Sequence, residues 1–197
     1  MNDAPRWSRI NNRVLEVLLG LGLVVALFSL GPPAQSILDH PAPRDVLLTD
    51  AATPDDLRLR GITLYRQGIA QMDFTHPHFT QRLLLVLPQI VTAVLIIMIL
   101  WCLLRLTQTF RQGDYFAPEN TRRLAVVAVA ILLSGLLVPA LDTITTQLLV
   151  NGTPAEPAVE VQYQFNAPLV YLGLLIAAAA QAFRNGTRLK ADSEGLV

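Results

Sequence analysis

Two long runs of uncharged apolar residues constrain this chain more than any other feature. Residues 83–104 are LLLVLPQIVTAVLIIMILWCLL, and residues 124–141 are LAVVAVAILLSGLLVPAL. Each run is close to the ~20 residues that an α-helix needs to cross a hydrocarbon core about 30 Å thick. A helix on a soluble core would keep a polar face, and neither run has one. The runs therefore predict two transmembrane helices joined by a polar connector, residues 105–123.

Two further apolar runs lie outside this pair. Residues 14–30 are interrupted only by Glu16, and residues 168–183 are shorter and rich in alanine, which allows close helix approach. The first run follows a short basic segment, so a cleaved secretory signal is an alternative to a retained helix. Its length and its acidic residue favour retention. We therefore expect an all-α membrane protein with four transmembrane helices.

The rest of the chain divides into two loops, a connector and a tail within one membrane domain. The predicted segments are transmembrane helices at residues 14–30, 83–104, 124–141 and 168–183, outer loops at 34–81 and 147–167, the connector at 105–123 and a tail at 184–197.

The two outer loops carry the strand signals. In residues 159–165 apolar and polar side chains alternate strictly, which is typical of a β-strand. A strand needs a partner to be stable, and the first outer loop is the one segment on the same side that can supply it. We therefore expect a small β cap built from both loops.

Residues 58–65 leave two interpretations open. They alternate at first and then slip at Gly61, which is compatible with a strand that carries a bulge. The alternative is a helix that opens at Thr53-Pro54-Asp55-Asp56, a sequence with favourable N-terminal chemistry. The strand is the preferred interpretation.

The basic residues predict the orientation in the membrane. Four crossings place both termini and the connector on one side, which carries ten basic residues: Arg6, Arg9, Arg13, Arg105, Arg111, Arg122, Arg123, Arg184, Arg188 and Lys190. The other side carries five, all in or bordering the long outer loop: Arg44, Arg58, Arg60, Arg66 and Arg82. The positive-inside rule then puts both termini in the cytoplasm and makes the β cap extracytoplasmic.

The overall charge does not favour nucleic acid as a direct partner. The chain has 15 basic and 15 acidic residues, so bulk electrostatics gives no argument for direct nucleic-acid binding. The lipid bilayer is the expected environment, and the cytoplasmic arginines suit anionic lipid or an acidic protein surface. The single cysteine, Cys102, excludes an intramolecular disulfide, and we interpret it as a small buried apolar residue.

A four-residue pattern occurs twice. Phe110-Arg111-Gln112-Gly113 follows the second helix and Phe183-Arg184-Asn185-Gly186 follows the fourth. Arginine near the negative end of a helix and glycine at a left-handed C-cap would both stabilise a helix terminus. An internal duplication and convergent capping explain the repeat about equally well.

These residues also carry a family resemblance. The pattern F-R-x-G-D-x-F-x-x-E-N-x-R-R-L at residues 110–124, with F-R-x-G-x-x-L at 183–189, resembles the DUF2975 family of small bacterial four-helix membrane proteins of unknown biochemical function. The resemblance would cover nearly the whole chain, although the C-terminal segment keeps the family pattern only loosely, at Asp192 and Leu196-Val197. It implies the bacterial cytoplasmic (inner) membrane. It also implies a helix-turn-helix regulator as a cytoplasmic partner, since such proteins are often encoded beside one.

No catalytic constellation is recognisable. There is no nucleophile triad, no P-loop and no His-Glu-x-x-His motif, so we expect neither an enzyme nor a cofactor. Asp73, His76 and His78 are weak metal candidates, since two imidazoles and a carboxylate suit zinc. A plain surface loop is the more ordinary interpretation of these three residues.

Four polar residues lie in or near the apolar runs: Glu16, Gln89, Asp142 and Gln181. Carboxylates inside a membrane are functional candidates. Glu16, however, is about one turn from the cytoplasmic boundary and could pair with Arg13. Asp142 follows the third run directly and is expected in the outer headgroup zone.

We interpret the chain as a non-enzymatic membrane regulator or sensor that contacts a cytoplasmic protein. The candidate contact residues are Arg111, Gly113, Phe116, Glu119, Asn120, Arg122, Arg123, Arg184 and Gly186. The alternative is a small transporter or pore, assembled as a homo-oligomer because four helices with few polar residues enclose little space. Asp142, Gln89 or Gln181 would then line its polar path.

Overall fold

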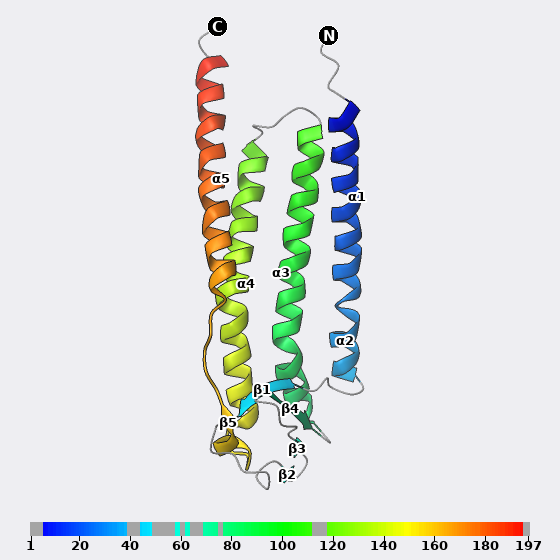
Figure 1. Ribbon diagram of the computed structural model, residues 1–197, viewed down its shortest axis with the longest axis vertical. Helices are drawn as coiled ribbons and strands as arrows, with labels where there is room; N and C mark the ends of the chain where they lie inside the picture. The colour runs from blue at the N-terminus through cyan, green and yellow to red at the C-terminus, as the bar shows by residue number, and fades with distance from the viewer. Residues whose placement is uncertain are drawn as a thin grey trace. The chain divides into compact units, whose positions relative to one another are not determined.

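A computed structural model of the chain describes residues 6–38, 44–48, 58–59, 62–63, 69–74, 77–111 and 118–194 (Figure 1). The helices are α1 (Arg6–Phe28), α2 (Gly31–Leu38), α3 (Phe79–Arg111), α4 (Pro118–Val150), the short 3₁₀-helix η1 (Glu156–Ala158) and α5 (Ala167–Glu194). The strands are β1 (Arg44–Leu48), β2 (Arg58–Leu59), β3 (Ile62–Thr63), β4 (Ile69–Phe74) and β5 (Val159–Glu160).

Four helical stretches in the described residues are long and apolar enough to cross a membrane: Arg13–Pro33, Phe79–Arg111, Pro118–Val150 and Ala167–Arg188. Large apolar side chains on them are exposed, such as Val17, Phe28 and Leu175. Exposed apolar surface on this scale needs an apolar environment, which a bilayer supplies. The chain is therefore a multi-pass membrane protein, as predicted.

Three helices continue beyond their predicted ends: α3 reaches Arg111, α4 reaches Val150 and α5 reaches Glu194. The outer loop is expected from residue 147, but α4 reaches Val150. Within this extension, Thr143, Thr145 and Thr146 donate their hydroxyls to carbonyls four residues earlier. Such bonds satisfy polar side chains within a helix. Likewise, α5 passes through Gly186, so this glycine does not form the expected C-cap.

The helices and strands form two compact units. Unit 1 comprises Met1–Phe28, Ala93–Leu136 and Asn166–Val197, and unit 2 comprises Ser29–Thr92 and Leu137–Phe165. Helices α3 and α4 contribute residues to both units, so the division leaves the predicted single membrane domain untested.

The strands of unit 2 form one sheet in the order β2-β3-β4-β1-β5. Strand β1 pairs antiparallel with β4 on one side and with β5 on the other, so Leu48 lies opposite Val159. The predicted sheet from both outer loops is therefore confirmed.

Two details of the strand predictions are wrong. Strand β5 ends at Glu160 rather than Phe165, because the chain leaves β1 to reach Asn166. The backbone N–H of Asn166 donates to the Gly135 carbonyl of α4. Residues 58–65 contain two strands instead of one bulged strand. Arg58 lies opposite Thr63, so the slip in the pattern marks a hairpin.

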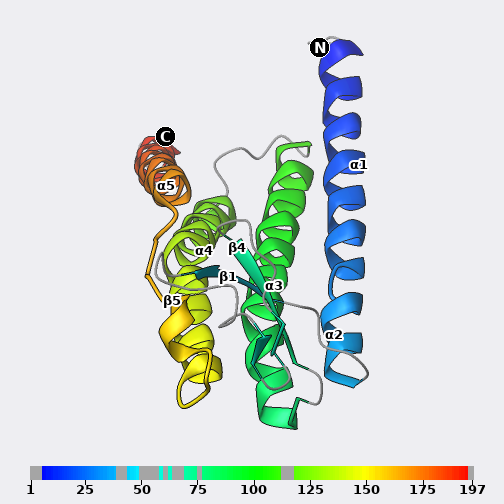
Figure 2. The same cartoon turned by 60° about the horizontal axis from the view of Figure 1, so that its bottom comes forward.

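The sheet and the helix ends of unit 2 share one hydrophobic core. Val46 of β1 and Met72 of β4 are buried in one cluster with Val86 of α3 and Leu149 of α4. Figures 1 and 2 show β1 and β4 beside these parts of α3 and α4. The core therefore attaches the strands to both helices.

Candidate functional site

The first candidate site is a buried arginine at the start of β1. Arg44 is 9% exposed, and its Nη2 forms an ion pair with the carboxylate of Asp142 in α4. The same nitrogen donates to the backbone carbonyl of Asp142 at 3.0 Å, and Nη1 donates to the carbonyl of Leu84 in α3 at 3.4 Å. One side chain from the sheet therefore bonds to both α3 and α4.

A proline explains why the Leu84 carbonyl is available. Pro88 lies four residues later and has no N–H, so it leaves this carbonyl without its helical donor. Arg44 supplies the missing donor. Thr92 then donates its hydroxyl to the carbonyl of Pro88 at 2.8 Å.

The same arrangement recurs in α4. Pro139 cannot donate to the carbonyl of Gly135, which instead accepts the N–H of Asn166 at 2.9 Å. Thr143 donates to the carbonyl of Pro139 at 2.8 Å. In each helix, the carbonyl that proline leaves without a donor is therefore satisfied from another segment of the chain. Arg44 of β1 donates to Leu84 in α3, and Asn166, which follows β5, donates to Gly135 in α4.

The second candidate site lies in unit 1, where α3 ends and α4 begins. Arg123 donates from Nη1 to the Thr109 hydroxyl at 2.7 Å, to Asn120 Oδ1 at 3.0 Å and to the Arg105 carbonyl at 3.4 Å. Asn120 is fully buried. These bonds tie the two helices together where they flank the connector.

Two more contacts join helices at this end of unit 1. Glu16 of α1 forms an ion pair with Arg111 of α3 at 3.1 Å. Its partner is therefore not Arg13, the residue that the sequence suggested. The rings of Phe110 and Phe183 stack, with centroids 6.4 Å apart. The two F-R-x-G segments therefore meet through their phenylalanines. The start of α1 and the end of α5 lie at this same end of the unit (Figure 1).

The predicted contact residues divide by exposure. Arg111, Glu119, Arg122 and Arg184 are exposed, whereas Asn120 and Arg123 are engaged inside the protein. Gly186 lies within α5, and Gly113 and Phe116 are outside the described residues. Exposed members of the set can reach a partner, and the buried asparagine instead shapes the helix ends.

The predicted membrane-zone polar residues belong to different units. Glu16 and Gln181 are in unit 1, and Gln89 and Asp142 are in unit 2. Both carboxylates are in ion pairs with arginine. Glu16 therefore helps to join α1 to α3, and Asp142 helps to join β1 to α4.

A metal site at Asp73, His76 and His78 stays a prediction. His78 is exposed before α3, His76 is outside the described residues, and the surroundings of the Asp73 side chain are not described. Cys102 is partly buried in α3.

Replacing Arg123 by lysine is expected to destabilise the protein by about 1–2 kcal/mol, because a lysine cannot replace the guanidinium's bonds to the Thr109 hydroxyl, to Asn120 Oδ1 and to the Arg105 carbonyl. Arg122→Lys is the matched control on the exposed neighbour and should change stability by about 0.5 kcal/mol or less. The measurement is unfolding in mixed micelles during a titration with a denaturing detergent. Equal effects of the two variants would contradict the structural role of Arg123.

Arg44 was not singled out in the sequence. It lies in the predicted outer loop 34–81, where it begins β1, and only the fold brings it to Asp142, 98 residues later. The repeated P-x-x-x-T of Pro88-Thr92 and Pro139-Thr143 is the signal that could have drawn attention to the freed carbonyls.

Comparison with known proteins identifies the family. Residues 67–197 match the model of DUF2975, a family described as a protein of unknown function. The match includes both F-R-x-G segments, but it starts later than the near-complete coverage expected. No curated protein and no solved structure matches the chain. The match extends over more than half of the chain, which therefore belongs to the DUF2975 family.

Proposed function

We propose that this protein is a non-enzymatic regulator of the bacterial cytoplasmic (inner) membrane, with both termini in the cytoplasm. Its β cap, the sheet β1–β5, would face the outside and respond to conditions there. The segment between α3 and α4 would face the cytoplasm and contact a soluble regulatory protein, for which a helix-turn-helix regulator is the candidate. The excess of arginine at the termini and the connector supports this orientation.

One observation carries the proposal. Helices α3 and α4 are each continuous over 33 residues, and the same two helices carry the cap core and flank the connector. A change in the cap that shifts Leu84 or Asp142 would therefore act on helices that lead directly to the cytoplasmic segment. Small shifts of packed helices are a common way to transmit a signal.

The exposed charges beside the connector support a partner surface. Arg111 ends α3, and Glu119 lies in the first turn of α4; both side chains are exposed. The bonds of Arg123 to Asn120 and Thr109 would hold these two charges at a fixed spacing. A preorganised pair of opposite charges favours one partner over others.

The test is photo-crosslinking in intact cells with a reactive residue at position 119. The matched control carries it at position 160, an exposed glutamate of β5. We expect a discrete soluble protein crosslinked from position 119 and absent from position 160. We also expect the yield to change when Arg44→Met loosens the cap.

Two results would contradict the proposal. Recovery of the same soluble protein from both positions would reject the orientation and the partner surface. A yield from position 119 that is unaffected by Arg44→Met, in a protein shown to be folded, would reject the coupling between cap and connector.

A further inference from the structure

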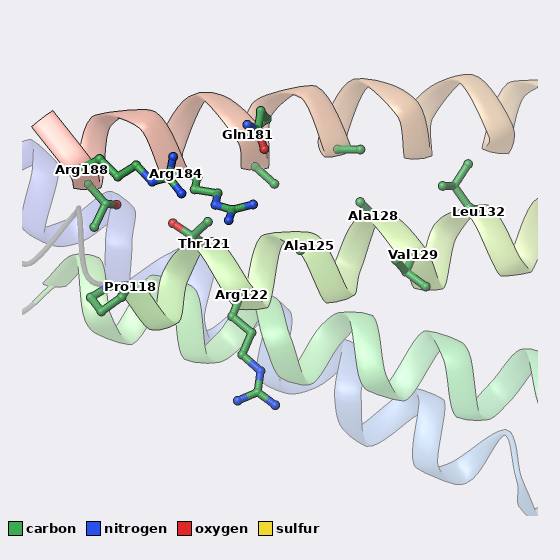
Figure 3. A pocket seen from close by; sticks show the side chains of 13 residues that line it. Pro118, Thr121, Arg122, Ala125, Ala128, Val129, Leu132, Gln181, Arg184 and Arg188 are labelled. Atoms are coloured by element: carbon green, nitrogen blue, oxygen red, sulfur yellow. The ribbon is translucent and has the colours of Figure 1, made fainter.

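Unit 1 contains an open groove between α4 and α5 with a volume of about 520 Å³. This lies within the ~300–1,000 Å³ usual for small-molecule sites. Its walls are mostly apolar, and its basic residues gather toward the start of α4 and the end of α5 (Figure 3). The groove is therefore amphipathic along its length.

Small side chains explain why the groove exists. Ala125 and Ala128 of α4 face the space that Ala177 and Ala180 of α5 also line. Alanine fills little of the volume between two helices. Helices α4 and α5 approach closely at Leu132, the lining residue farthest along α4, where a Cβ added at Gly173 would lie 2.7 Å from Leu132 Cγ.

The basic end of the groove has unpaired positive charge. Arg122, Arg184 and Arg188 line it, and none of its described lining residues is acidic. Nor does any carboxylate in the described segments form an ion pair with these arginines. Figure 3 shows Arg184 and Arg188 extending between the two helices, whereas Arg122 extends away from α5.

One further polar atom lies at this end. The hydroxyl oxygen of Thr121 is buried and has no hydrogen-bond partner among the described residues. Figure 3 places Thr121 on the side of α4 that faces Arg184 and Arg188. A buried hydroxyl without a partner costs free energy, which a ligand with an acceptor oxygen would recover.

We propose that the groove binds an anionic glycerophospholipid of the surrounding membrane. The phosphate accepts hydrogen bonds from Arg184 and Arg188 and from the Thr121 hydroxyl, with Arg122 at the rim. An acyl chain lies along Ala125, Ala128 and Ala177 toward Leu132. The basic end of this site includes Thr121 and Arg122 of the connector, but lipid binding at the groove does not depend on the proposed function.

Length and charge favour a lipid over other occupants. From Thr121 to Leu132 a helix rises about 16 Å, close to the ~15 Å depth of one leaflet's hydrocarbon. An acyl chain whose headgroup meets the arginines would therefore fit the apolar part. A second copy of this chain could cover the alanines, but it would have to neutralise the arginines as well. Basic pockets between membrane helices commonly bind anionic headgroups.

The test is native mass spectrometry of the full chain in detergent, titrated with phosphatidylglycerol or with phosphatidylcholine. We expect phosphatidylglycerol to bind more tightly. Arg184→Gln with Arg188→Gln should weaken its binding by on the order of tenfold or more. Ala125→Leu, at an exposed groove position, should weaken it without changing the charge.

Arg13→Gln with Arg105→Gln is the matched control, since both arginines are exposed, neither lines the groove and neither forms an ion pair with a described carboxylate. The proposal is overturned if this control weakens phosphatidylglycerol binding as much as the groove variants do. Equal binding of both lipids would also overturn it, as would full competition by inorganic phosphate. A dimer that dissociates in Ala125→Leu, with no lipid bound to the wild type, would assign the groove to a second copy.

Discussion

Replacing Arg44 by methionine is expected to destabilise the protein by about 2–4 kcal/mol. Methionine keeps the apolar stem of the side chain and removes every guanidinium bond. The carbonyl of Leu84, which lacks a helical donor because of Pro88, then has no replacement donor in the described part of the chain. The sheet also loses its ion pair with Asp142. The measurement is detergent-induced unfolding in mixed micelles.

A double-mutant cycle separates the ion pair from the carbonyl bonds. Asp142→Asn alone should cost about 1–2 kcal/mol, since it leaves the buried guanidinium without a counter-charge but keeps an acceptor oxygen. In the double variant Arg44→Met with Asp142→Asn, the loss should be close to that of Arg44→Met alone. The carboxylate is 58% exposed, so water can solvate it once Arg44 is absent.

Two further variants make this result specific. Arg44→Lys keeps the charge, but a single ammonium group cannot donate to α3 and α4 at once as the guanidinium does. The stability of this variant should therefore lie between those of the wild type and Arg44→Met. Glu160→Gln is the control for the loss of an acidic residue, because this exposed glutamate lies in β5 and forms no ion pair with a described residue. Additive effects of Arg44→Met and Asp142→Asn would contradict the ion pair.

The membrane-spanning helices were predictable because the bilayer imposes a strong local requirement. A run such as residues 83–104 satisfies it by composition alone, without knowledge of its neighbours. The ends of the helices depend on other forces. Helix α4 continues past its apolar run, and the hydroxyls of Thr143 and Thr146 there bond to its own backbone, an arrangement that hydropathy does not report.

The sheet was predictable only in outline. The alternation in residues 159–165 indicates a strand but not its length. The length also depends on the contacts of the residues that follow, and here the N–H of Asn166 bonds to the Gly135 carbonyl of α4, away from β1. A slip in alternation accompanies both a β-bulge and a hairpin turn, so the sequence alone does not distinguish the β2–β3 hairpin from a bulged strand.

The candidate sites depend on contacts between distant residues. The F-R-x-G repeat indicated helix ends, but the stacking of Phe110 on Phe183 could not be inferred from either copy alone. Asn120 was expected among the contact residues because it lies in a polar, family-like motif, and it is in fact buried. The same sequence motif can therefore serve a partner surface or the packing beneath it, and only burial distinguishes the two roles.

Replacing Gly173 by valine is expected to destabilise the protein by roughly 3 kcal/mol, through overpacking of α5 against α4. An added Cβ would lie 2.7 Å from Leu132 Cγ and 3.1 Å from the Leu132 backbone nitrogen, so one helix must move. Gly173→Ala should cost less, because alanine adds a smaller group and raises helix propensity by about 1 kcal/mol. Unfolding in mixed micelles measures both variants.

Gly20→Ala in α1 is the matched control, because nothing lies within 4 Å of its added Cβ; this variant should be neutral or slightly stabilising. Combining Gly173→Ala with Leu132→Ala should recover part of the lost stability, since the second change removes the clashing side chain. If Gly173→Val were as stable as the wild type, the close approach of α4 and α5 would be wrong.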